Sequence, residues 1–356
     1  MTTPRISLAL IVVSGFLFAQ CSKNNTAPEH AGGKAVVDTT QKAEPVKIED
    51  ANHHIYFHPP VGNVGRYHIM DRMMRTFSDQ TLDGKTNKQS IVSVTDFYIR
   101  QTVKSVGKDS VVELTYRIDS IELKSQRDTS IVHYSSGNAV DRKDDRFHEF
   151  NLILGKEFSI KTNKYGDPDS ITDTKAIENA LLASAPDTIR TKPQVKTQAK
   201  QLAKELIGQV INTYVMHILA HSPTRALVKD TTWHNVSEVN LEVARGLSFP
   251  VVVDASETVH GLEKRGDKVL AVLEDHTSSS PKQTVIDEGE AKATVNNFSA
   301  TSKSIMRMED ATGLLVHRST EEKRSFTFQI ESKQHPAEKR LISQDGSETM
   351  TAELIE

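Results

Sequence analysis

Two histidines stand four residues apart in the segment His-Ile-Leu-Ala-His, at positions 217 and 221. On a helix this spacing places both imidazoles on one face, where they can bind a metal ion. The glutamate of the metalloprotease motif is absent, because residues 218 and 219 are Ile and Leu. We therefore expect no metal ligands and no cofactor, and keep a metal-assisted hydrolase as an alternative hypothesis only.

Carboxylates occupy positions 1, 3, 7 and 12 of a twelve-residue calcium-loop template that starts at Asp167. Ile171 stands at position 5, where the loop needs an oxygen ligand, and Thr172 stands at position 6, where it needs glycine. We interpret the run as a turn that leads into a helix, with Asp173 capping it. The motifs of serine hydrolases and of nucleotide-binding loops are also missing, so the sequence predicts no catalytic residues and no enzyme.

The only cysteine, Cys21, follows an apolar leader. Arg5 precedes a 14-residue apolar run from Ile6 to Ala19, and the residues after Cys21 are polar. This order is typical of a secretory signal, and the run is too short to span a bilayer about 30 Å thick. The sequence therefore predicts export.

The run Phe18-Ala19-Gln20-Cys21 resembles the lipobox of bacterial lipoproteins. The resemblance implies that residues 1–20 are removed and that Cys21 is diacylated and anchors the protein in a membrane. The alternative is ordinary cleavage after Ala19, which would give a soluble periplasmic protein. We expect a lipid-anchored protein of the bacterial cell envelope, at the outer membrane or in the periplasm.

Composition limits the class of protein. The 356 residues are 37% hydrophobic and 26% charged, which fits a folded chain and excludes a protein with several membrane spans. Lys and Arg number 44 against 47 Asp and Glu, without a concentrated basic face, so we expect no nucleic-acid partner.

Alternating apolar residues predict strands before and after a central helical region. Val112 to Ile118 alternate with polar residues, and the phase shifts near Asp119-Ser120, which indicates a β-bulge. A second long strand over 90–106 precedes it, and Gly107 begins the turn that makes the two a hairpin. Similar signals return after residue 228 and predict a second β-rich part.

Between residues 173 and 222 the apolar period becomes helical. A short helix is expected near Ile177–Ala183, and a longer one begins at Pro193 and ends at Ser222-Pro223. The longer helix carries an apolar stripe that includes Leu202, Leu206, Val210 and Tyr214. We predict that this stripe either lines a site for a hydrophobic ligand or is ordinary core.

We therefore expect an α+β protein of long antiparallel strands, in one curved sheet or two lobes, with the central helical segment packed on the sheet. The expected organisation is a signal peptide at 1–20, a flexible tether at 21–58, a β-rich lobe at 59–172, a helical segment at 173–222, a second β-rich lobe at 223–332 and a charged tail at 333–356.

Four short motifs resemble an uncharacterised lipoprotein family of unknown function in Bacteroidota-type bacteria; they are Gly65-Arg-Tyr67 and residues 112–118, 230–233 and 310–314. The resemblance implies an envelope location and no catalytic residues. We expect a membrane-tethered, non-catalytic protein that binds a hydrophobic ligand or a partner protein. A soluble periplasmic or surface structural protein is the alternative.

Overall fold

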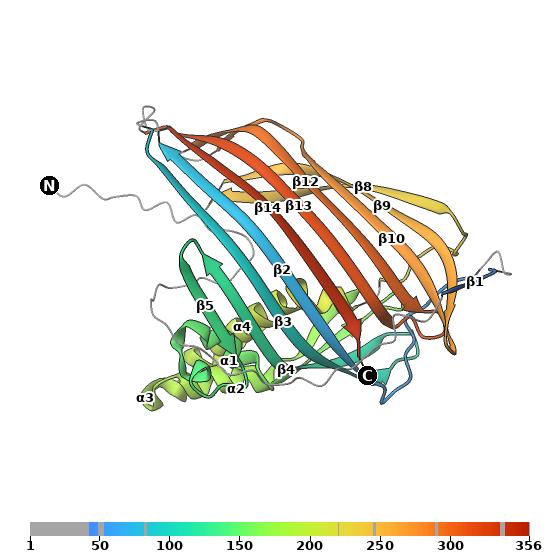
Figure 1. The fold of residues 1–356 in the computed structure, drawn as a ribbon. Coiled ribbons are helices and arrows are strands. Elements are labelled where there is room, and N and C mark those ends of the chain that lie inside the picture. The colour runs from blue at the N-terminus through green and yellow to red at the C-terminus, as the bar shows by residue number, and fades with distance from the viewer. Residues whose placement is uncertain are drawn as a thin grey trace.

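The computed structural model describes residues 43–48, 53–81, 84–219, 221–244, 247–288, 291–334 and 339–355. Over this part of the chain one antiparallel sheet of 14 strands dominates, and a group of helices lies together on one side of it (Figure 1). The α+β class with mainly antiparallel strands is thereby confirmed.

Most of the strands are long and follow one another as a meander. In chain order they are β1 (Glu44–Val46), β2 (Val64–Thr81), β3 (Thr86–Val106), β4 (Val112–Arg127), β5 (Ser130–Ser135), β6 (Glu157–Thr162), β7 (Pro168–Asp173), β8 (Thr231–Ala244), β9 (Leu247–Arg265), β10 (Lys268–Pro281), β11 (Val285–Glu288), β12 (Ala291–Glu309), β13 (Leu315–Ser332) and β14 (Lys339–Leu354).

The sheet is continuous from one β-rich part to the other. Its order is β1-β9-β10-β12-β13-β14-β2-β3-β4-β6-β7, with β8 beside β9, β5 beside β4 and β11 beside β12. The junction is the pairing of β14 with β2, from Leu354 opposite Tyr67 to Arg340 opposite Thr81. Of the two arrangements that the sequence left open, the structure therefore has the single sheet.

Five of the eight helical elements in the described residues come from the predicted central segment 173–222, and the other three lie before it, at residues 141–153. In chain order the eight are η1 (Asp141–Lys143), η2 (Asp145–Phe147), α1 (His148–Ile153), α2 (Lys175–Ser184), α3 (Asp187–Arg190), α4 (Pro193–Val210), η3 (Ile211–Val215, a π-helical turn) and α5 (Met216–Ile218). The last three are consecutive and form one long helix over residues 193–218, behind the sheet in Figure 1. None of the helices in the described residues is long and apolar enough to span a membrane.

The predicted hairpin and its bulge are both present. β3 and β4 pair antiparallel, and the register shifts where Ser120 faces Tyr98 and Ile118 faces Ile99. Asp119 is the extra residue, as the phase shift of the apolar pattern predicts. The turn closes through a bond from the Gly107 amide to the Val111 carbonyl.

Two expected segment boundaries are wrong. Residues 339–354, expected in a charged tail, form β14 in the middle of the sheet, because both neighbouring strands supply backbone partners along it. The tether expected up to residue 58 ends earlier, because Glu44–Val46 pairs with β9 and the side chains of Ile55 and Phe57 are buried in the core.

Apolar packing is divided into two clusters. The larger one joins the strands around β2, β3 and β4 to the long helix, and includes Phe97, Tyr214 and Ile207. The smaller one lies towards the other end of the sheet and includes Phe249 and Phe328, whose rings are 5.2 Å apart. We call the sheet face that packs against the long helix the inner face.

Candidate functional site

Charged side chains lie on the inner face beside the end of the long helix. Because side chains alternate along each strand, the registers place Glu257, Asp275 and Arg318 on the face that also carries the core residues. Asp71 and Arg75 on β2, with Glu348 on β14, continue the row. We call these six residues the inner polar belt.

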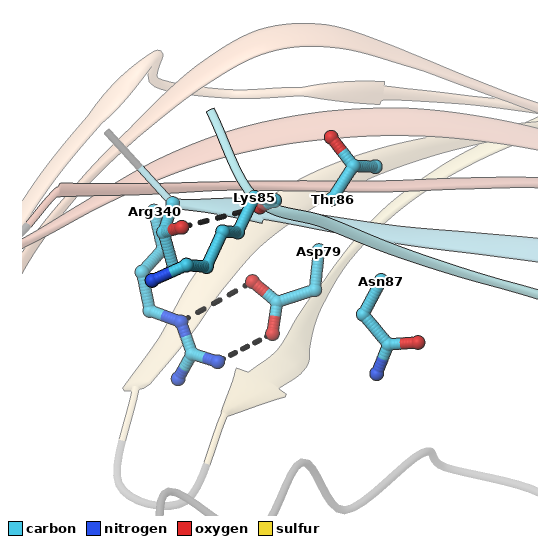
Figure 2. A pocket seen from close by; sticks show the side chains of 6 residues that line it. Asp79, Lys85, Thr86, Asn87 and Arg340 are labelled. Atoms are coloured by element: carbon cyan, nitrogen blue, oxygen red, sulfur yellow. Dashed lines mark hydrogen bonds and ion pairs between the residues drawn. The ribbon is translucent and has the colours of Figure 1, made fainter. Parts of the chain in front are cut away.

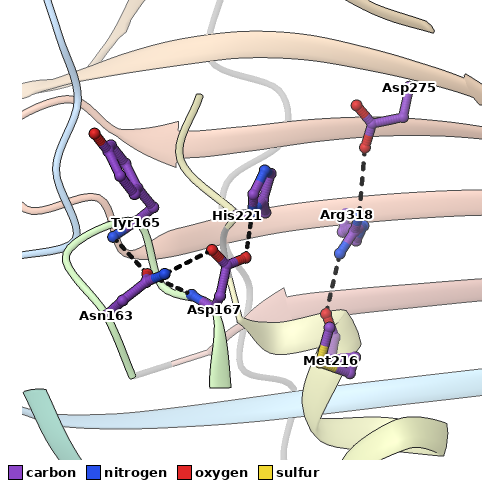
Figure 3. Close-up of polar contacts among 7 residues, drawn as sticks. All are labelled: Asn163, Tyr165, Asp167, Met216, His221, Asp275 and Arg318. Atoms are coloured by element: carbon purple, nitrogen blue, oxygen red, sulfur yellow. Dashed lines mark hydrogen bonds and ion pairs between the residues drawn. The ribbon is translucent and has the colours of Figure 1, made fainter. Parts of the chain in front are cut away.

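Arg318 connects the belt to the helix. Its guanidinium donates to the Met216 carbonyl oxygen at 3.1 Å, to Ser304 Oγ at 3.0 Å and to Asp275 Oδ2 at 3.4 Å. Figure 3 shows Arg318 between Asp275 and Met216. Burial lowers the pKa of Arg318 and Asp275 opposes that shift, so the guanidinium remains a cation held between strand and helix.

Glu257 and Asp275 face each other across β9 and β10. Burial, and then the neighbouring Asp275, raise the pKa of Glu257 to about 7. Glu257 Oε1 is buried without a hydrogen-bond partner among the described residues. Burial also raises the pKa of Asp275, while Arg318 lowers it. Two like charges on adjacent strands therefore favour a proton on Glu257.

Asp71 on β2 is, like Glu257, a carboxyl group with a raised pKa and a buried oxygen that has no partner in the described part of the chain. Its Oδ1 is buried without a partner among the described residues, and burial followed by the charge of Glu348 raises its pKa to about 7. Arg75 instead pairs with Glu348 at 2.9 Å. The belt thus holds four carboxyl groups and two guanidiniums, and the two carboxyl groups without a salt bridge are those that hold a proton near neutral pH.

The two candidate metal histidines have separate surroundings. The long helix ends at Ile218, and Leu219 is extended, so the residues do not share one helix face. Burial, and then the charge of Arg318, lower the pKa of His217 to about 4. His221 instead contacts Asp167 at 2.5 Å. Among the described residues no three His, Cys, Asp or Glu side chains are grouped to hold a metal ion.

The run of carboxylates at 167–178 contains a turn, the strand β7 and the start of α2, so the sequence interpretation of a turn leading directly into a helix missed the strand that pairs with β6. Asn163 accepts from the Tyr165 amide at 2.8 Å and donates to Asp167 at 2.8 Å (Figure 3). Asp173 Oδ1 accepts from the Lys175 amide at 2.9 Å, at the start of α2. The turn therefore orients Asp167 towards His221 at the end of the long helix.

The apolar stripe is mostly packed. Val210 and Tyr214 are buried, and Leu206 packs against the same cluster. The rings of Tyr214 and Phe97 are 3.8 Å apart. Leu202 is 52% exposed and lies outside this contact. The structure therefore brings three of the four predicted ligand-binding residues to the inner face. Cys21 lies outside the described residues.

Two hollows in the surface of the described residues lie away from the long helix. One of about 450 Å³ lies where β2, β3 and β14 meet, and there the Arg340 guanidinium and the Asp79 carboxylate form an ion pair (Figure 2). Another of about 240 Å³ lies near the bulge at Asp119 and is lined by Arg66, Tyr98 and Ser120, among others.

Comparison with known proteins gives a family without a known function. Residues 109–315, more than half of the chain, match the model of the family of unknown function DUF6263. The chain belongs to the DUF6263 family. The resemblance to an uncharacterised family of unknown function is thereby confirmed. No curated protein matches this DUF6263 sequence.

Solved structures resemble the DUF6263 chain only distantly. A lipovitellin structure described by its lipid–protein interactions matches 82% of this chain at 10% identity and a TM-score of 0.39, and the match spans a quarter of the lipovitellin chain. A porin mutant of Rh. blastica matches 79% of this chain and 99% of its own at 7% identity and a TM-score of 0.18. A loop-deletion mutant of OmpT, an outer membrane protein of Vibrio cholerae, matches 82% of this chain and 100% of its own, at 9% sequence identity and a TM-score of 0.18. These scores are too low to transfer a function.

Proposed function

We propose that the protein is an exported, non-catalytic lipoprotein of the bacterial envelope. It is held on a membrane through Cys21 and binds a hydrophobic ligand between the long helix and the inner face. The observation that carries the proposal is the contact between Tyr214 and Phe97, at 3.8 Å between ring centroids. Through this contact the long helix covers an apolar part of the inner face. The neighbouring positions on that face carry the charged side chains of the inner polar belt.

The ligand takes the place of helix side chains. Val210 and Tyr214 are buried against the sheet, whereas Leu202 and Met216 are 52% and 37% exposed. An acyl chain that enters beside these exposed residues separates the stripe from the sheet and keeps both apolar surfaces away from water. The bond from Arg318 to the Met216 carbonyl must open for this displacement.

Lipidation of Cys21 is tested by expressing the full chain and its Cys21→Ser variant in a bacterium. The expected wild-type product begins at Cys21, carries a diacylglyceryl mass and sediments with membranes, while the variant lacks that mass. An unmodified product that begins at Gln20 would contradict the anchor and favour the soluble periplasmic alternative.

Ligand binding is tested on the full chain carrying Cys21→Ser, with a fluorescent long-chain fatty acid as the probe. We expect saturable binding, and tighter binding after Arg318→Met, which frees the helix end. Arg324→Met is the matched control on the same strand, because Arg324 bonds Glu322 and not the helix. No binding to any of the three proteins would contradict the ligand site and leave a partner protein to be identified by pull-down.

A further inference from the structure

β8 forms one margin of the sheet beyond β9 (Figure 1). It pairs antiparallel with β9 from Thr231 opposite Val259 to Ala244 opposite Leu247. Within the described residues no strand pairs with its other side. The outward N–H and C=O groups of this 14-residue strand are therefore a template for another strand.

The other margins of the sheet have protection that β8 lacks. β7 has six residues and begins at Pro168, β5 has six residues, and β11 has four. Short strands, prolines and lysines are the usual means of preventing edge pairing. β8 is 14 residues long and contains no Pro, Lys, Arg or Gly between 231 and 244. Its composition permits pairing along its whole length.

Both faces of β8 expose apolar side chains. Val236 is 64% exposed and Val239 is 48% exposed, and alternation places them on opposite faces. Trp233, on the same face as Val239, packs against the core. Each face therefore has a valine that a neighbouring strand would cover.

We propose that β8 pairs antiparallel with β8 of a second copy of this chain, with Val236 opposite Val236 at a two-fold axis. Residues whose numbers sum to 472 then face each other. His234 of each copy lies opposite Glu238 of the other, and this imidazole–carboxylate pairing occurs twice. On the other face Trp233 lies opposite Val239 of the second copy. Two-fold pairing of one identical strand is a closed interface, so it stops at a dimer.

The carboxylate of Glu238 disfavours a neighbouring register. Shifting the axis to residue 238 would place Glu238 opposite Glu238, and like charges directly opposite each other destabilise a strand pair. Within each chain Lys282 contacts Glu238 at 2.7 Å, so the proposed register adds His234 of the second copy to an existing ion pair. Val236 opposite itself and Thr232 opposite Asn240 add uncharged pairs on the outer face of the paired stretch 231–241, and Glu242 falls beyond this stretch, opposite Asp230, which precedes the strand.

Disulfide cross-linking tests both the dimer and its register, because Cys21 is the only native cysteine. In the full chain carrying Cys21→Ser, Val236→Cys places two thiols directly opposite each other, within the span of a disulfide. We expect rapid formation of a covalent dimer under mild oxidation. Val239→Cys is the matched control on the same strand, since its two copies would lie about 20 Å apart at about 3.3 Å per residue.

A second control separates pairing from random collision. Ile131 is 64% exposed on β5, a short edge strand elsewhere in the sheet, so Ile131→Cys measures the collisional rate. Equal cross-linking rates for Val236→Cys, Val239→Cys and Ile131→Cys would overturn the proposal.

Sedimentation velocity of the Cys21→Ser chain gives the second measurement. We expect twice the chain mass, and a shift to the monomer after Val236→Lys with an unchanged far-UV circular dichroism spectrum. A monomer before the substitution would overturn the proposal. If the amides of β8 in that monomer are nevertheless protected from hydrogen exchange, the occupant is the chain's own residues 22–42, and deleting them would remove the protection.

Discussion

The Arg318 guanidinium donates a hydrogen bond of 3.1 Å to the carbonyl oxygen of Met216, 102 residues earlier in the chain. The last carbonyl groups of a helix have no partner within it, so this bond satisfies one of them. The same guanidinium contacts Asp275 on β10. One partly buried cation therefore holds the end of the long helix on the inner face.

Replacing Arg318 with Met is expected to lower the free energy of unfolding by about 2–4 kcal/mol. The side chain of Arg318 is only 17% exposed, so its loss leaves the Met216 carbonyl without its donor and Asp275 without its cation. Urea denaturation measures the loss. Hydrogen exchange should also accelerate at the amides of residues 211–218, because the helix end is released.

Arg324→Met is the control for this effect. Arg324 lies six residues further along β13 and contacts Glu322 at 2.9 Å, with both side chains about one third exposed. Removing such an ion pair is expected to cost about 0–1 kcal/mol. If Arg324→Met destabilises the protein as much as Arg318→Met does, the bond to the helix is not the source of the effect.

The stripe on the long helix gives a prediction that separates packed from exposed positions. Tyr214→Ala removes a buried ring that contacts Phe97, and is expected to cost about 3–5 kcal/mol of unfolding free energy. Leu202→Ala alters an exposed residue on the same helix and should change stability by less than about 0.5 kcal/mol. Thermal and urea denaturation of both variants check the pair. A large loss at Leu202 would show that this residue belongs to the packed stripe.

The local features of the sheet follow from short-range patterns. The bulge at Asp119 is predictable because apolar residues on both sides keep a period of two with a shifted phase. β14 is not predictable in this way, because Gln344, Gly346 and Glu348 interrupt its inward-facing positions between Ile342 and Met350. Only the neighbouring strands reveal that these polar residues face inwards.

The inner polar belt has a similar explanation. Tyr67 and Ile69 are buried at alternate positions of β2, and Asp71 continues the same parity. A charged residue in phase with buried residues is a usable signal for an inward-facing charge. The meeting of Glu257 with Asp275, or of Arg318 with Met216, depends on strand registers that a single sequence does not give.

Glu257 predicts how stability depends on pH. Its pKa is about 7 in the folded chain, against 4.5 for an unperturbed glutamate. Between these values the folded chain binds more protons than the unfolded chain, so the free energy of unfolding falls as the pH rises from about 4.5 to 7. A glutamine at position 257 cannot ionise, so the Glu257→Gln variant does not show this fall in the free energy of unfolding. Relative to wild type, we expect the variant to gain about 3 kcal/mol of unfolding free energy between pH 4 and pH 8, because each pKa unit corresponds to about 1.4 kcal/mol.

Glu274, the neighbour of Asp275 in the chain, is the control of opposite sign. The side chains of Lys303 and His260 lower its pKa, so its contribution to stability is present above pH 4.5 and is lost as the pH falls. The difference in unfolding free energy between Glu274→Gln and wild type should therefore be a loss at neutral pH and should shrink towards pH 3. Urea denaturation at several pH values distinguishes the two variants, and parallel curves would contradict the burial of Glu257.

The turn before β13 fixes the segment that enters the core ahead of β2. Gly313 has a φ of +68°, and a Cβ atom there would lie 2.6 Å from the Tyr56 carbonyl oxygen and 2.9 Å from the Phe57 Cα atom. The amide of His58 also donates to the Thr312 carbonyl at 2.9 Å. The chain from residue 55 to 58 and this turn therefore fit only without a side chain at position 313.

Gly313→Ala is expected to cost more than Gly155→Ala, although both glycines have a φ of +68°. A Cβ atom at Gly155 meets nothing within 4 Å, so that variant carries only the cost of the left-handed conformation, about 1–2 kcal/mol. Gly313→Ala adds a backbone clash that must displace Phe57, whose side chain is only 1% exposed. Urea denaturation gives the two costs, and hydrogen exchange at residues 55–58 should rise for Gly313→Ala alone. Equal effects of the two substitutions would mean that the segment does not pack against the turn.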